Sequence, residues 1–218
     1  MTLSKLFELA NHSGGTLYLM CLLLLVALTV IIERTRFLST MQQGGDDLIN
    51  LLDANTPLHA EEMQKALRKH SQHPHISLFQ ASLIEPVESE RDTCAGHLEE
   101  AVMREVPTLD RSLWVLDTVI TLAPLLGLFG TIVGMFSAFA VLGDVQGGAS
   151  QVTGGIAEAL IATASGLMIA MIGLVFFNWL NTKVRVIVHQ METIKVMLLN
   201  RRFGAPAVAG LRAALKAV

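Results

Sequence analysis

Two long stretches of the chain contain no charged side chain, and they lie close together in the sequence. The first covers 26 residues between Asp117 and Asp144, and the second covers 24 residues between Glu158 and Lys183. At 1.5 Å per residue a 24-residue helix is roughly 36 Å long, which is enough to cross a hydrocarbon core about 30 Å thick. The pattern therefore predicts two membrane-spanning helices joined as an antiparallel hairpin.

A third apolar run extends from Leu17 to Ile32 and is followed at once by the charged residues 33–36. A cleaved signal segment is the alternative interpretation. The basic residues follow the run instead of preceding it, however, and no small-x-small cleavage site is present. We therefore interpret this run as a retained first span.

The segment between the first and second spans is polar, with apolar residues at helical spacing. Asp46 and Asp47 precede apolar pairs that predict a short helix, and residues 61–70 form an amphipathic pattern. Another helix is predicted to start at Pro86 and to run through Cys94, Leu98 and Val102 toward Pro107.

Three histidines, at positions 70, 73 and 75, lie close together in this segment. Such a cluster is one way to bind zinc, but no further ligand follows at the spacing of a zinc site. We therefore interpret the cluster as part of a solvated loop and expect no metal there.

Two apolar stripes predict helices that extend beyond the membrane. The first stripe leads without interruption into the second span, so this span is predicted to be the end of a longer helix. The second stripe follows the third span, and both extensions are predicted to pack together. The stripes comprise Leu109, Leu113, Leu116 and Ile120, and Val184, Ile187, Met191, Ile194 and Leu198.

Lysine and arginine are distributed very unevenly about the three spans. One of the 16 precedes the first span, eight lie between spans one and two, none lies in the hairpin loop, and seven follow span three. The positive-inside rule then places the N-terminus and the hairpin loop outside the cytoplasm. The predicted segments are a periplasmic N-terminus (1–16), transmembrane helices at 17–32, 118–142 and 153–182, a cytoplasmic helical domain (33–117), a periplasmic loop (143–152) and a cytoplasmic C-terminal helix and tail (183–218).

Composition supports this all-α membrane fold, with three transmembrane helices and long cytoplasmic helical extensions. Only 16% of the residues are charged, against about 25% in soluble domains. A net charge of −3 gives no reason to expect nucleic acid. The chain has no phosphate-binding glycine loop and no catalytic triad or zinc-protease motif. We therefore expect neither an enzyme nor a cofactor, and we expect the two cysteines to be reduced.

Glu158 stands at the edge of the third span, where an acid is costly and usually meets a partner, a cavity or an ion path. The alternative is an interfacial residue stabilised by the dipole at the helix N-terminus. Two observations favour an inward position. The hairpin loop holds one charge only, so the helix can start earlier, and Ser165 lies within about 20° of Glu158 on a helix. Thr163 lies roughly 140° away from Glu158.

Small residues dominate the second and third spans at helical spacing. Such residues let helices approach closely, and we expect them to serve helix packing. The Leu-rich part of the first span suits lipid, so spans two and three are predicted to line the pore of an oligomer. The packing residues are Gly127, Gly130, Gly134, Ala162 and Gly166.

Two runs in these spans resemble signatures of a known family. The run TLAPLLGLFGTIVGM at 121–135 resembles the second-span signature of the MotA/TolQ/ExbB family, and GIAEALIATA at 155–164 resembles the third-span signature of its ExbB/TolQ branch. Two departures occur in span three. Gly154 stands where the family usually has proline before Gly-Ile-Ala-Glu, and Gly173 replaces a usual mid-span proline.

The resemblance implies an inner-membrane pentamer around two copies of a single-span partner, ExbD-like or TolR-like, that carries a membrane aspartate. Proton flow would move that partner and energise TonB or TolA across the periplasm. Carried over by position, Glu158, Thr131 and Thr163 match the polar residues of the family's proton path. Ser165, where the family has an aliphatic residue, adds a fourth candidate for the pore lining.

The resemblance therefore implies the ExbB-like subunit of a proton-driven motor that serves import through the outer membrane. A TolQ-type subunit for envelope integrity is the closest alternative. A MotA-type stator would have four spans. A secondary transporter would need internal repeats with broken helices, and a non-conducting scaffold would leave Glu158 without a purpose.

Overall fold

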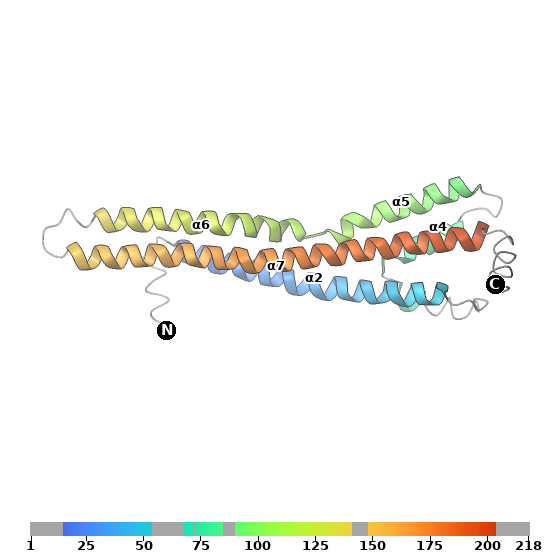
Figure 1. Ribbon diagram of the computed structural model, residues 1–218, viewed down its shortest axis with the longest axis horizontal. Helices are drawn as coiled ribbons and strands as arrows, with labels where there is room; N and C mark the ends of the chain where they lie inside the picture. The colour runs from blue at the N-terminus through green and yellow to red at the C-terminus, as the bar shows by residue number, and fades with distance from the viewer. Residues whose placement is uncertain (1–14, 54–67, 72, 85–89, 141–147, 204–218) are drawn as a thin grey trace, which may run out of the picture. The chain divides into compact units, whose positions relative to one another are not determined.

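The chain folds into helices in a computed structural model that describes residues 15–53, 68–71, 73–84, 90–140 and 148–203 (Figure 1). Within those ranges no strand occurs. Three helices are long and apolar enough to cross a membrane, judged by length and composition. The predicted all-α fold with three membrane-spanning helices is thereby confirmed. The helices are α2 (Thr16–Asp53), α4 (Ile76–Ile84), α5 (Arg91–Leu109), α6 (Leu113–Ala140) and α7 (Gly148–Phe203).

The helices are distributed over two compact units. One consists of Met1–Thr35 with Ser112–Leu180, and we call it the apolar unit because it holds the three hydrophobic segments. The other consists of Arg36–Arg111 with Asn181–Val218, and we call it the polar unit. Helices α2 and α7 each contribute residues to both units.

Helix α2 is one continuous helix of 38 residues. The prediction of a separate short helix after Asp46 is therefore wrong. Two adjacent glycines, Gly44 and Gly45, stand in its interior, each costing about 1 kcal/mol of helix stability relative to alanine. Burial of Leu38 and Leu48 on either side of them outweighs that cost. Most of the amphipathic segment predicted at 61–70 lies outside the described residues.

The stripe that was predicted to continue into the second span is broken. Helix α5 ends at Leu109, α6 begins at Leu113, and Ser112 between them has a left-handed φ of 66°. Leu109, Leu113 and Leu116 are buried as the stripe predicts, whereas Ile120 is only half-buried and its neighbour Val119 is buried instead. The prediction of one uninterrupted helix is nevertheless wrong, because side-chain periodicity does not report the backbone dihedral of a single residue.

The remaining helical predictions for the polar unit hold. Cys94, Leu98 and Val102 are buried on α5, which packs against α4. Pro107 lies inside the last turn of α5, and Pro86 lies outside the described residues. On α7 the predicted stripe is buried except at its end, where Leu199 is buried and Leu198 is only half-buried.

In the apolar unit α6 and α7 run antiparallel, with small residues at their contact (Figure 1). A Cβ placed on Gly127 would lie 3.0 Å from Cα of Thr163, and one on Gly134 would lie 2.9 Å from Cβ of Ala159. Such spacing leaves no room for a side chain on the α6 glycines. We call this line of contacts the seam.

We predict that Gly166→Ala destabilises the protein by about 1–3 kcal/mol, because the added methyl group would overlap the carbonyl oxygen of Ala123 across the seam. Gly154→Ala is the matched control on the same helix, since nothing lies within 4 Å of its Cβ position. The control is expected to gain up to about 1 kcal/mol from helix propensity. Thermal unfolding in mild detergent measures both, and a Gly166→Ala variant as stable as wild type would contradict the packing.

We also predict that Ser112→Gly stabilises the chain by about 1 kcal/mol, because glycine adopts a left-handed φ without steric cost. Ser112→Ala keeps the Cβ and should change the unfolding midpoint little. If the glycine variant is no more stable than the alanine variant in the same thermal measurement, the strain at this position is absent.

Candidate functional site

Glu158, Ser165 and Thr131 flank the seam, whereas the backbone of Thr163 forms part of it, because a Cβ on Gly127 would lie 3.0 Å from its Cα. On α7 the buried residues Ala159, Ala162 and Gly166 face α6. Glu158 and Ser165 each precede one of these residues by a single position. Thr163 follows Ala162 by one position. Because consecutive residues turn by about 100° around a helix, Glu158 and Ser165 lie on one flank of the seam and Thr163 on the other.

Thr131 on α6 follows the seam residue Gly130 by one position. On two antiparallel helices that face one another, a step toward the C-terminus turns to the same side of their contact. Thr131 and Thr163 therefore share one flank, and Glu158 and Ser165 share the other. By this geometry the four predicted residues are distributed over the two flanks of the seam.

Each of the three hydroxyl groups donates a hydrogen bond to a backbone carbonyl. Ser165 donates to Ile161 O at 2.8 Å and Thr131 to Leu128 O at 2.6 Å, both within their own helix. Thr163 donates across the seam to Gly127 O at 2.9 Å. The close approach at Gly127 makes this bond possible. Thr163 thus ties α6 to α7, a role that spacing within one helix did not predict.

Glu158 is half-buried beside the seam. It differs in this from Leu160, two residues further on, which is 63% exposed on the outward face. Among the described residues none forms a hydrogen bond or ion pair with its carboxylate. A carboxylate in this setting can accept a proton or a hydrogen-bond donor from a group outside the chain.

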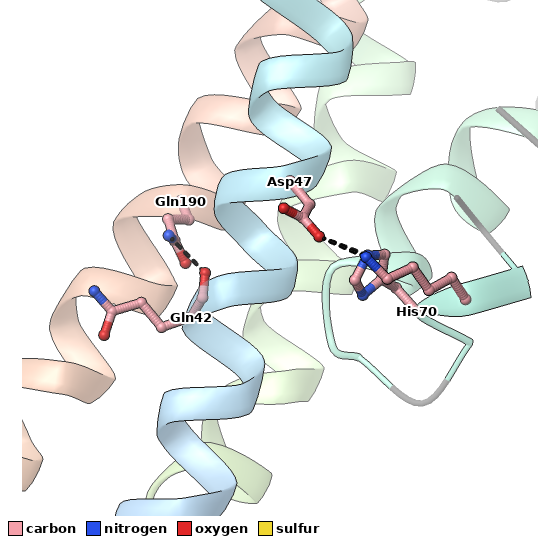
Figure 2. Close-up of polar contacts among 5 residues, drawn as sticks. Gln42, Asp47, His70 and Gln190 are labelled. Atoms are coloured by element: carbon pink, nitrogen blue, oxygen red, sulfur yellow. Dashed lines mark hydrogen bonds and ion pairs between the residues drawn. The ribbon is translucent and has the colours of Figure 1, made fainter. Parts of the chain in front are cut away.

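The burial of the histidines in the polar unit was not predicted from the sequence. His70 is 6% exposed and His75 is 0% exposed, so the prediction of a solvated loop is wrong. His70 Nε2 lies 3.2 Å from Asp47 Oδ2, as Figure 2 shows. The adjacent glycines of α2 are the feature of the sequence that could have indicated this burial. A Cβ on Gly44 would overlap the ring of His73.

A second polar contact in the same unit joins α7 to α2. Gln190 Nε2 donates to Gln42 O at 3.1 Å, as Figure 2 shows. It also donates to Asp46 Oδ1 at 2.7 Å. Gln190 is buried, and its Oε1 has no hydrogen-bond partner among the described residues. In the described ranges no three His, Cys, Asp or Glu side chains are grouped so that they could hold a metal ion.

Burial lowers the pKa of His75 from 6.5 to about 4. A positive charge on His73 acts in the same direction, and the Gln190 side chain opposes it. Burial also lowers the pKa of His73, and the charge of His70 adds to that effect. Both imidazoles are therefore neutral at neutral pH.

Comparison with known proteins adds the evolutionary context. A family model described as the MotA/TolQ/ExbB proton channel family matches residues 58–193. The putative biopolymer transport protein ExbB-like 3 of Synechocystis sp. is 34% identical over 189 residues, which cover 82% of this chain and 87% of that protein. The Tol-Pal system protein TolQ of Haemophilus influenzae is 42% identical over 88 residues, 40% of this chain and 39% of TolQ. The biopolymer transport protein ExbB of Neisseria gonorrhoeae is 33% identical over 98 residues, 43% of this chain and 44% of that protein.

We predict that Thr163→Val destabilises the protein by about 0.6–1.7 kcal/mol, the usual range for a hydrogen bond between membrane helices. Ser165→Ala is the control, because it removes a hydroxyl that bonds only within its own helix. Thermal unfolding in detergent compares the two variants. Equal midpoints for both would show that the Thr163 bond does not hold the hairpin together.

Proposed function

This chain belongs to the MotA/TolQ/ExbB proton channel family, and we propose that it is the ExbB-like subunit of a motor driven by the proton motive force. In this proposal it lies in the bacterial inner membrane with its N-terminus in the periplasm and its C-terminus in the cytoplasm. The motor would energise a TonB-like partner that spans the periplasm, and this partner would drive import through the outer membrane.

The observation that carries the proposal is the half-buried carboxylate of Glu158 beside the seam. An ionised acid in an apolar membrane helix is unfavourable by several kcal/mol, so its presence indicates a proton path or a partner. A carboxylate is also the simplest group that takes up and releases a proton in place. One charge that crosses 100 mV releases about 2.3 kcal/mol, which is enough to bias a conformational step.

The two flanks of the seam suggest how an oligomer would use the polar residues. Chains arranged as a ring, which we propose to be a pentamer, would place neighbouring hairpins flank to flank. Thr131 and Thr163 of one chain would then stand beside Glu158 and Ser165 of a neighbouring chain, at the edge of the lumen. The partner in the lumen would be an ExbD-like or TolR-like single-span protein, and its membrane aspartate would pass along these groups.

The packing in the apolar unit is compatible with that arrangement. The small residues of the seam are occupied by contacts within one chain, so contacts between chains would use other faces. Large apolar side chains cover the outward faces of α6, including Phe136 at 77% and Ile132 at 60% exposure. These faces are available to lipid or to a neighbouring copy.

A TolQ-type role is the second candidate, and one comparison favours it. TolQ of Haemophilus influenzae has a higher identity than ExbB of Neisseria gonorrhoeae, 42% against 33%, over a matched segment of similar length. The match over most of the chain, however, is to an ExbB-like protein. Copurification with a TonB-like or a TolA-like protein from the native membrane distinguishes the two roles.

We predict that Glu158→Gln lowers proton flux at least tenfold while the oligomer remains intact, because glutamine keeps the shape and hydrogen bonding but cannot release a proton. The measurement uses proteoliposomes that contain the chain with its single-span partner, an imposed pH gradient and a pH-sensitive dye inside. Size-exclusion chromatography checks assembly.

Asp117→Asn is the matched control for this experiment, since Asp117 is an exposed acid at the edge of the other charge-free stretch. It should leave proton flux unchanged. Wild-type flux in Glu158→Gln would remove the proton role from this residue and, with it, the basis of the proposed function.

A further inference from the structure

The histidines of the polar unit lie against the two adjacent glycines of α2. We call residues 68–71 and 73–76 the histidine segment. A Cβ on Gly44 would overlap His73 and lie 3.0 Å from His70 Nδ1, and one on Gly45 would lie 2.6 Å from His75 Nε2. The imidazole rings therefore occupy the space that a side chain on α2 would otherwise fill. The fit requires two glycines at this point in a long helix.

One end of the histidine segment is held by charge. Asp47 Oδ2 lies 3.0 Å from Lys69 Nζ and 3.2 Å from His70 Nε2. The hydrogen bond from Lys69 lowers the pKa of Asp47 below its ordinary value. The Asp47 carboxylate therefore stays charged in the pH range in which histidines titrate, and this end stays attached to α2.

The other end of the segment buries its histidines away from charged partners among the described residues. His75 is fully buried, and neither of its ring nitrogens has a hydrogen-bond partner among the described residues. Within the described ranges His73 Nδ1 is likewise buried without a hydrogen-bond partner, and its ring centroid lies 4.7 Å from that of His70. A charge on His75 would be buried with only the uncharged Gln190 side chain to oppose the cost. A charge on His73 would be disfavoured by the charge of His70.

The charged groups around the segment do not remove this penalty. From α2, Asp46 bonds Gln190 and Asp47 is engaged by Lys69 and His70. From α7, Gln190 is uncharged, and Lys183 donates to Gln42 Oε1 at 3.0 Å. From α5, Glu105 lines a cavity of about 250 Å³ together with His73, and burial raises the pKa of Glu105. No acid in the described residues forms an ion pair with His75.

We propose that the histidine segment is a proton-operated latch on the polar unit, anchored at Asp47 and released at its His73–His75 end when these histidines take up protons. The latch closes over Gly44 and Gly45 at neutral pH. It opens on acidification of the compartment that the polar unit faces. This mechanism is independent of Glu158.

The size and sign of the effect follow from proton linkage. The closed latch holds His75 with a pKa of about 4, and the released side chain returns to 6.5. Above pH 6.5, the ordinary pKa of the side chain, His75 is neutral in both the closed and the open latch. The closed latch is then most stable. As the pH falls from 6.5 toward 4, the open state binds a proton that the closed state does not. Between about pH 7.5 and about pH 5.5 the equilibrium constant for opening should rise about tenfold through His75 alone.

Hydrogen exchange of backbone amides tests the latch in the intact, detergent-solubilised protein. The amides of His73 and Ile76 donate to His70 O and His73 O within the segment. Their protection factors, corrected for the intrinsic effect of pH on exchange, should fall about tenfold between about pH 7.5 and about pH 5.5. Amides within α5 serve as the internal reference and should keep their protection. Constant protection of the segment over this range would overturn the proposal without any variant.

Two variants separate the latch from general acid sensitivity. His75→Gln cannot titrate, so its protection factors should lose the tenfold dependence on pH. Gly45→Ala would press a methyl group against His75 Nε2 and Gln190 Oε1, so it should open the segment at every pH. His189→Gln is the matched control, because His189 is exposed on α7, and it should behave as wild type.

A pH dependence in His75→Gln equal to that of wild type would also overturn the proposal. If His75→Gln does not fold, as judged by yield and circular dichroism, His73→Gln takes its place. That variant should then weaken the pH dependence through the lost repulsion between His70 and His73.

Discussion

The close approach of the α6 and α7 backbones is the constraint on which the apolar unit depends. Lipid is as apolar as the helices, so burial of hydrocarbon gives membrane helices little reason to associate. Tight packing and hydrogen bonds between helices must supply the attraction instead. Glycine at 127 and 166 removes the Cβ that would hold the backbones apart. The same spacing brings Gly127 O within reach of the Thr163 hydroxyl.

The seam also determines where polar groups stand. Residues in the seam must be small, so any functional side chain has to lie one position away from it. Thr131 and Thr163 do so on one flank, and Glu158 does so on the other. A hairpin of this kind presents two polar edges, and a ring of hairpins combines the edges of neighbouring chains. The surface by which α6 and α7 pack within a chain is therefore distinct from the flanks, whose polar groups would act between chains.

The sequence predicted the features that depend on periodicity. Charge-free stretches identified the spans, and the apolar stripe of α7 identified buried residues from Val184 to Ile194. Three features escaped because they depend on contacts or dihedrals that no local pattern encodes. The break at Ser112 depends on one backbone angle, and the Thr163 bond joins residues 36 apart. The burial of His75 depends on a glycine pair some 30 residues earlier in the sequence.

The polar unit achieves its packing in a different way. Its helices are joined by contacts of buried or half-buried polar groups, including Lys195 with Glu99 and Arg201 with Leu52 O. Each such contact must compensate the desolvation of its own groups, so its stability depends on protonation more than apolar packing does.

The histidine segment is the extreme case in the polar unit. It buries an imidazole for which the described residues offer no charged partner, and in our proposal it stays closed only while that imidazole is neutral. The apolar unit holds its carboxylate beside a seam of small residues and backbone atoms, which do not titrate. The polar unit uses titratable groups as part of its packing. A chain built in this way can keep its membrane hairpin constant while proton concentration alters the structure outside it.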